Sequence, residues 1–115
     1  MSGVTKHIFE HELDDILSMW NTEIKSVTPL LPRKYTKADI IALLKYYYPH
    51  EWQSVESKYK YYRTKDKYLK RRFGKSRYNM SEPELLIQRV SAFKKIFSES
   101  YKYAHWNAYS ERNRV

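Results

Sequence analysis

The sequence contains no cysteine and has few of the residues that interrupt regular structure. Without cysteine, neither a disulfide framework nor a zinc site built on thiolates can form. Small secreted domains usually depend on disulfides, so this absence favours an intracellular protein. Only 2 glycines and 4 prolines occur in 115 residues, which favours a folded, ordered chain over a disordered one.

Long apolar runs are also missing. No stretch approaches the ~20 apolar residues that a membrane-spanning helix needs, and the N-terminal residues lack the apolar segment and cleavage site of a signal peptide. We therefore expect no membrane partner. A chain of 115 residues predicts a single helical domain over residues 1–115. The alternative that the chain is a fragment or subunit of a larger nucleoprotein assembly stays open.

Apolar residues recur at three- and four-residue steps along nearly the whole chain, which is the period of an α-helix. Local start and stop signals sharpen this pattern: Thr36 stands three residues before Asp39 in a capping-box arrangement, Gly74 is a helix stop, and Ser81 begins a strong helix start. The predicted helices cover about 6–26, 36–47, 49–73 and 83 onwards, the last bending or restarting near 98–100.

These signals predict an all-α fold, a small four-helix domain with two long C-terminal helices around an aromatic-rich core. The apolar stripe of the third helix is expected to continue through Tyr68 and Phe73. The stripe of the fourth helix is expected to include Ala104 and Ala108. The central members of the four stripes are Trp20, Leu44, Trp52 and Phe93.

Residues 58–77 carry a charge equal to that of the entire protein. Ten of these twenty residues are Lys or Arg and one, Asp66, is acidic, which gives 10 − 1 = +9, the formal net charge of the whole chain. Such a localised basic stripe is typical of a surface that binds a polyanion. Tyrosines and Phe73 lie between the charges, and aromatic rings next to cations suit nucleic acid because bases can stack on them.

We therefore predict a nucleic-acid-binding protein that grips phosphates through this basic, tyrosine-interleaved helix. Arginines suit bidentate contacts with phosphate or guanine, lysines act as point charges, and tyrosines can stack. The candidate binding residues are Lys58, Lys60, Arg63, Lys67, Lys70, Arg71, Arg72, Lys75, Arg77, Tyr61 and Tyr68.

Two alternatives concern the partner. The second and third predicted helices resemble a helix-turn-helix pair, which slightly favours DNA over RNA, although the cations lie beyond the N-terminal turn that would read bases. In the other alternative, the chain is a small protein-interaction or inhibitor module that docks its basic, aromatic face on an acidic partner protein.

Motifs for catalysis are weak. His7, Glu10 and His11 match H-x-x-E-H, a metalloprotease pattern, but no third ligand is evident. Gly74-Lys75-Ser76 resembles the end of a phosphate-binding loop, yet Leu69 stands where the earlier glycine is needed. The sequence therefore predicts no catalytic residue, no metal, no cofactor and a protein that is not an enzyme.

Overall fold

The structure, a computed structural model, describes residues 2–112 and confirms the all-α fold. No strand occurs within this range. The elements in chain order are α1 (Ser2–Val27), η1 (Thr28–Leu30), α2 (Lys37–Tyr47), α3 (Pro49–Phe73), α4 (Pro83–Leu86), η2 (Ile87–Arg89), α5 (Ser91–Ile96) and α6 (Glu99–Arg112), where η marks a short 3-10 helix.

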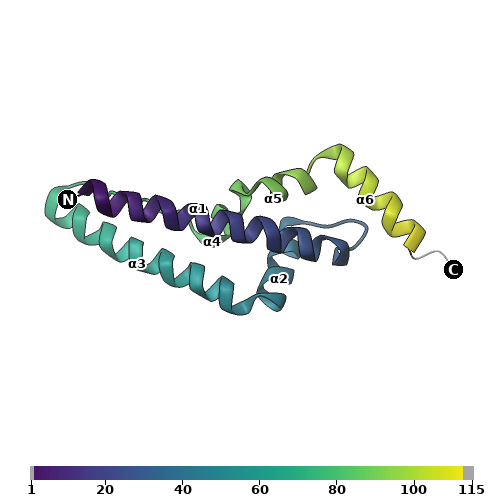
Figure 1. Cartoon of the computed structure of the whole chain (residues 1–115), viewed down its shortest axis with the longest axis horizontal. Coiled ribbons are helices and arrows are strands. Elements are labelled where there is room, and N and C mark those ends of the chain that lie inside the picture. Colours follow the sequence, from purple (N-terminus) through teal and green to yellow (C-terminus); the bar gives the residue numbers. More distant parts are fainter. Residues whose placement is uncertain (1, 113–115) are drawn as a thin grey trace.

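The molecule is elongated, with dimensions of 64 × 25 × 20 Å. The two long helices α1 and α3 run alongside each other for most of this length (Figure 1). Trp20 of α1 lies against Trp52 of α3, with ring centroids 5.4 Å apart, and Phe9 lies against Tyr62 nearer the other end. The C-terminal end of α3 is therefore at one tip of the molecule, and α6 is at the opposite tip (Figure 1).

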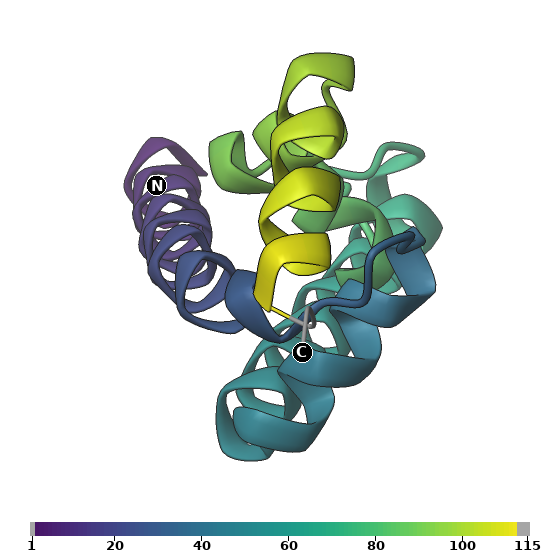
Figure 2. The same ribbon diagram turned by 90° about the vertical axis from the view of Figure 1, so that its right-hand side faces the viewer.

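The main core lies where α1, α2, the start of α3 and the segment 86–96 meet. Seen along the long axis, α1 lies on one side and α2 and α3 on the other, with the 83–96 segment above them (Figure 2). The four residues predicted to lie centrally are all confirmed as core residues, because Trp20, Leu44, Trp52 and Phe93 are at most 3% exposed.

Helix boundaries with a local chemical signal are where the sequence predicts them. The Thr36 hydroxyl accepts from the Asp39 backbone N–H, and the Asp39 carboxylate accepts from the Thr36 backbone N–H, so the capping box is formed. Helix α3 begins at Pro49, and Tyr48 alone separates it from the end of α2 at Tyr47. Gly74 ends it with a φ of 79°, in the left-handed region that suits glycine.

The prediction of one long fourth helix is wrong, and with it the count of four helices. Residues 83–112 form α4, η2, α5 and α6, because Val90 is extended, with a ψ of 133°, and α5 ends at Ile96. The chain becomes helical again at Glu99, within the region 98–100 where a bend or restart is predicted. The breaks change the direction of the chain, and side chains on both sides of the break at Val90, such as Ile87 and Phe93, are buried in the core. Ser81 is not the cap either, since α4 begins after Glu82 without a side-chain cap.

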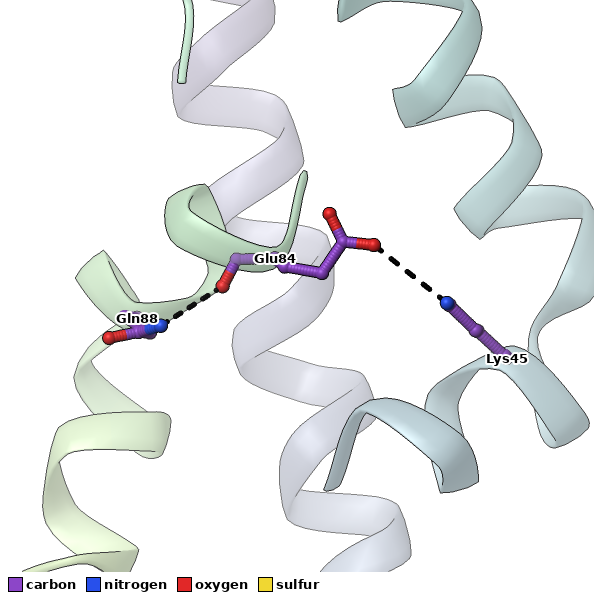
Figure 3. Close-up of polar contacts among 3 residues, drawn as sticks. All are labelled: Lys45, Glu84 and Gln88. Carbon is purple, nitrogen blue, oxygen red and sulfur yellow. Dashed lines mark hydrogen bonds and ion pairs between the residues drawn. The ribbon is translucent and has the colours of Figure 1, made fainter. Parts of the chain in front are cut away.

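Polar contacts fix the returning segment on the helices beneath it. The Asn21 side chain of α1 accepts a hydrogen bond of 2.9 Å from the Ala92 backbone N–H at the start of α5. Lys45 of α2 lies 3.8 Å from the Glu84 carboxylate, and Gln88 donates to the Glu84 carbonyl over 3.2 Å. Figure 3 shows these two contacts of Glu84. These contacts tie α4 to α2 and stabilise the break after η2.

The apolar face predicted for the last helix is also wrong in detail. Ala104 and Ala108 are exposed, and His105 is the buried residue of α6. Its Nε2 lies 3.1 Å from the Pro32 carbonyl, and Arg112 donates to the Pro29 carbonyl over 2.7 Å. Helix α6 is therefore held by the 28–35 segment more than by an apolar stripe. Across residues 2–112, no helix combines the length and the apolar character needed to cross a membrane.

Glu23 of α1 is a buried carboxylic acid. Glu23 is 7% exposed, and its Oε2 has no hydrogen-bond partner. Burial, together with the nearby charge of Glu51, raises the pKa of Glu23 from 4.5 to about 7. The folded state thus favours the protonated form of Glu23. The stability that this preference contributes is fully present below pH 4.5, the unfolded pKa, and is lost as the pH rises through about 7, the folded pKa.

We expect Glu23→Gln to stabilise the protein at pH 8, because a neutral amide removes the cost of a buried charge. Allowing for partial screening by solvent, the gain is about 1–3 kcal/mol, and it should shrink near pH 5, where Glu23 is protonated. Urea unfolding at several pH values measures this. Parallel stability curves for the two proteins from pH 5 to pH 8 would contradict the assignment.

Candidate nucleic-acid interface

The C-terminal half of α3 and the loop that follows it form the basic tip of the molecule. After Gly74, residues 75–80 fold back along α3 instead of leaving it. The Asp66 carboxylate accepts hydrogen bonds from three consecutive backbone N–H groups, those of Arg77 (2.9 Å), Tyr78 (2.9 Å) and Asn79 (2.6 Å). The single acidic residue in the basic run therefore holds the loop against the helix.

A small aromatic cluster anchors the same loop. The ring of Tyr78 packs against Phe9 of α1 and Tyr62 of α3, with centroid distances of 5.1 and 4.7 Å. The Tyr62 hydroxyl also donates to Glu12 over 3.1 Å. This second apolar cluster joins the N-terminal part of α1, α3 and the loop, so the basic residues are held on a fixed framework.

The Asp66 contacts have a direct test in backbone hydrogen exchange. Burial raises the pKa of Asp66, but the three backbone hydrogen bonds and the Arg77 charge together lower it, so the net pKa is below its usual value. The ionised Asp66 carboxylate therefore stabilises the folded state at pH values above its pKa in the unfolded chain. This stabilisation is lost as the pH falls through its lower pKa in the folded protein.

We expect Asp66→Ala to speed amide exchange at residues 77–79 and to cost about 1–3 kcal/mol, since charge-assisted hydrogen bonds are lost. Asp15→Ala, at an exposed position of α1, is the matched control and should change neither quantity. Unchanged exchange at residues 77–79 in the Asp66 variant would show that the loop is held by other contacts.

Two cavities flank α3 at this tip. We call the first the cationic groove; it has a volume of about 240 Å³ and is lined by Tyr59, Arg63, Asp66, Lys67 and Lys70 of α3 together with Ser76, Asn79 and Met80. We call the second the aromatic groove; it has a volume of about 370 Å³ and is lined by Thr64, Lys65, Tyr68 and Leu69 of α3 together with Arg77 and Tyr78.

The two grooves lie on different sides of α3. Residues two or five positions apart point about 140–160° apart around an α-helix, which separates Lys65 from Arg63, Lys67 and Lys70, and Tyr68 from Arg63 and Lys70. The loop lies between the grooves, and it contributes residues to both. The basic run is thus divided into a face of cations and a face of mixed aromatic and cationic residues.

The structure brings together five of the eleven predicted binding residues. Arg63, Lys67 and Lys70 share the cationic groove, and Tyr68 and Arg77 share the aromatic groove. The other six line neither groove: Lys60, Tyr61, Arg71, Arg72 and Lys75 are exposed near them, and Lys58 is half-buried.

The expected apolar stripe of α3 ends earlier than predicted. Tyr68 is 59% exposed and Phe73 is 66% exposed, because α3 extends past the core and the loop covers only one side of it. Two exposed rings of α3, those of Tyr61 and Phe73, lie next to cations. The Lys65 ammonium is 4.8 Å from the Tyr61 ring centroid, and the Arg72 guanidinium is 5.7 Å from that of Phe73.

Sequence reasoning missed Lys65, Ser76 and Asn79 as groove residues. Lys65 lies within the basic run, so charge alone could have included it. The roles of Ser76 and Asn79 depend on the loop folding back. The available signal was Asp66, a lone acid among cations; the positive φ of Asn79, 49°, is seen only in the structure.

In the part of the chain that the structure describes, no cation of the basic tip forms an ion pair with a carboxylate. Between residues 2 and 112 the structure contains one ion pair, Lys45–Glu84, and neither residue belongs to the basic tip. On α3, Lys67 has Arg63 and Arg71 four positions away, and like charges at this spacing repel by a few tenths of a kcal/mol per pair. The concentration of cations thus costs free energy in the isolated chain.

The weak metal-ligand pattern of His7, Glu10 and His11, from which no metal site was predicted, gains no support from the described residues. His7 and His11 are in edge-to-face contact, with centroids 5.4 Å apart. No group of three or more metal-binding side chains occurs in the part of the chain that is described. The absence of a metal or cofactor remains a prediction.

No family model matches the chain, and no solved structure matches it. One curated protein is similar: "Putative cyclic ADP-D-ribose synthase TIR2" of Cytobacillus dafuensis, which is 26% identical over 99 residues. The match covers 86% of this chain and 26% of TIR2, so the chain spans about a quarter of the length of this relative.

This similarity overturns the prediction that the protein is not an enzyme, because the relative's name is that of an enzyme. The prediction rested on the absence of catalytic motifs within 115 residues.

Proposed function

We propose that the chain binds nucleic acid through its basic tip, with the cationic groove and the exposed arginines and lysines around it in contact with phosphates. The observation that carries this proposal is the concentration of cations at one tip without a carboxylate within ion-pair distance in the described residues. A phosphate backbone would relieve their mutual repulsion and release counterions. A single-signed surface of this kind exceeds what solubility needs, since solubilising surfaces usually mix both signs.

The helix-turn-helix resemblance remains a proposal of its own. Helices α2 and α3 are separated by Tyr48 alone, but in the N-terminal turns of α3 the residues Trp52 and Val55 are buried and the cations begin only at Lys58. We therefore place the nucleic acid at the C-terminal half of α3 and propose an intracellular location, where nucleic acid is accessible.

Salt dependence tests this proposal. If about four to six phosphates are neutralised, log K on duplex DNA should fall against log salt with a slope of about −3.5 to −5.5. Fluorescence anisotropy from 50 to 200 mM salt measures the slope. A slope near zero would contradict phosphate contacts, and would favour an acidic protein as the partner of the same surface.

A second candidate function comes from the similarity to TIR2. We propose that the chain takes part in the synthesis of cyclic ADP-ribose, the product in the relative's name. The aromatic groove supports this candidate, because a ring with cations at its rim suits the base and phosphates of an ADP-ribose unit as well as those of a nucleic acid.

The test incubates the purified chain with NAD, which contains the ADP-ribose unit, and measures cyclic ADP-ribose by mass spectrometry, with and without added oligonucleotide. Product formation that is lost in Tyr68→Ala would support the candidate. Absence of product in every condition would contradict a synthase formed by these residues alone.

A further inference from the structure

One side of α3 presents aromatic rings and cations in alternation. Tyr61, Lys65, Tyr68 and Arg72 follow one another at steps of four, three and four residues, so they lie along one stripe of the helix. We call these four residues the stacking stripe. Tyr61 is 54% exposed and Tyr68 is 59% exposed, so a large part of each ring is available to a ligand.

The stripe and the cationic groove suit different parts of a nucleotide. The groove on the other side offers cations and hydrogen-bonding groups but little exposed aromatic surface, whereas the stripe offers ring faces. The aromatic groove beside Tyr68 is lined by the apolar Leu69, by the ring of Tyr78 and by the cations Lys65 and Arg77. Its volume of about 370 Å³ is within the range of small-ligand sites, roughly 300–1,000 Å³.

We propose that the stacking stripe and the aromatic groove bind unpaired bases, so that the ligand of the basic tip is single-stranded nucleic acid. This inference rests on the proposed function and specifies its ligand. Aromatic side chains on a positively charged surface are how proteins hold single strands, since every base has a π-face that can stack.

The geometry disfavours a duplex on this side of the helix. Base faces inside a duplex are covered by their neighbours, at a spacing of about 3.4 Å along each strand. Tyr61 and Tyr68 are seven residues apart, or about 10 Å along the helix, so two stacked neighbours in a duplex cannot use both rings. An unstacked strand can place separate bases on the two rings while its phosphates reach Lys65, Arg72 and Arg77.

The site is also held in place before any ligand arrives. The backbone N–H of Arg77 donates a hydrogen bond to the Asp66 carboxylate, and the ring of Tyr78 packs against Phe9 and Tyr62. The loop therefore does not need to be ordered on binding, which lowers the entropic cost of association.

The experiment measures the affinity of the whole chain for three fluorescein-labelled ligands at low salt: dT20, an abasic 20-mer with the same phosphates, and the dT20–dA20 duplex. Tyr61→Leu with Tyr68→Leu removes the stacking faces and keeps apolar bulk. Tyr46→Leu with Tyr47→Leu, at exposed positions of α2, is the matched control. Circular dichroism melts confirm that both variants fold.

We expect the wild type to bind dT20 at least about 10-fold more tightly than the abasic strand, the factor that stacking of one base supplies. The Tyr61 and Tyr68 variant should lose this difference and bind both strands like the abasic one, while its affinity for the duplex stays within about twofold. The α2 control should behave as the wild type.

Equal binding of dT20 and the abasic strand by the wild type would overturn the inference while leaving phosphate binding intact. An equal loss on single strand and duplex in the Tyr61 and Tyr68 variant would also overturn it, because the rings would then not be specific to unpaired bases. Failure of the wild type to bind any of the three ligands would overturn the proposed function, and the inference with it.

Discussion

Reversing four charges at the basic tip should abolish nucleic-acid binding. In the variant with Lys67, Lys70, Arg71 and Arg72 changed to Glu, we expect affinity for any oligonucleotide to fall at least about 100-fold, because each lost phosphate contact removes counterion release and each new carboxylate repels the strand. All four side chains are exposed and none forms an ion pair, so the fold should remain intact by circular dichroism.

A matched control separates a local surface from bulk charge. Lys25, Lys34, Lys94 and Lys95 are exposed lysines outside the basic tip, and changing all four to Glu alters the net charge by the same amount. We expect this variant to retain most of the affinity in anisotropy titrations. Similar losses in the two variants would mean that net charge alone, and not the tip, governs binding.

The largest effect on stability is expected for Trp52→Ala. The Trp52 ring is 3% exposed and lies against Trp20, and the Lys45 ammonium is 5.2 Å from its centroid. Removing a buried aromatic side chain of this kind costs about 3–5 kcal/mol, which is a large part of the ~5–15 kcal/mol available to a small domain. Urea unfolding followed by circular dichroism measures the loss.

Two further substitutions make the measurement specific. Trp106→Ala removes a ring that is 36% exposed and should cost much less. Trp52→Phe should cost less than Trp52→Ala, because the buried Trp52 Nε1 has no hydrogen-bond partner to lose. Near wild-type stability of Trp52→Ala would show that α3 packs through another face, and the two grooves on α3 would have to be redrawn.

The sequence predicted those parts of the fold whose cause is local. The capping box of Thr36 and the left-handed Gly74 fix the start of α2 and the end of α3 through residues next to them. The restart of the helix near 98–100 was also predicted. The break at Val90 was not, because it depends on packing and on distant partners such as Asn21, which accepts a hydrogen bond from the Ala92 backbone N–H.

The same distinction between local causes and distant contacts applies to the candidate site. The basic run is visible in the sequence, because it depends only on composition. Its division into a cationic and an aromatic groove depends on the loop returning to Asp66, across 11 to 13 positions of the chain, and on Tyr78 reaching Phe9. The prediction of a non-enzyme failed for a further reason, since motifs within one chain do not report an activity that a longer relative carries in its name.

The most direct test of nucleic-acid binding at the basic tip is to map the contact surface on the folded protein. Backbone amide NMR spectra of the 15N-labelled chain, recorded while dT20 is added at low salt, report which residues change environment. We expect the perturbed amides to cluster within residues 60–79, on both sides of α3 and in the loop that is hydrogen-bonded to Asp66. Perturbations concentrated in α6 and the 28–35 segment, with residues 60–79 unchanged, would contradict it.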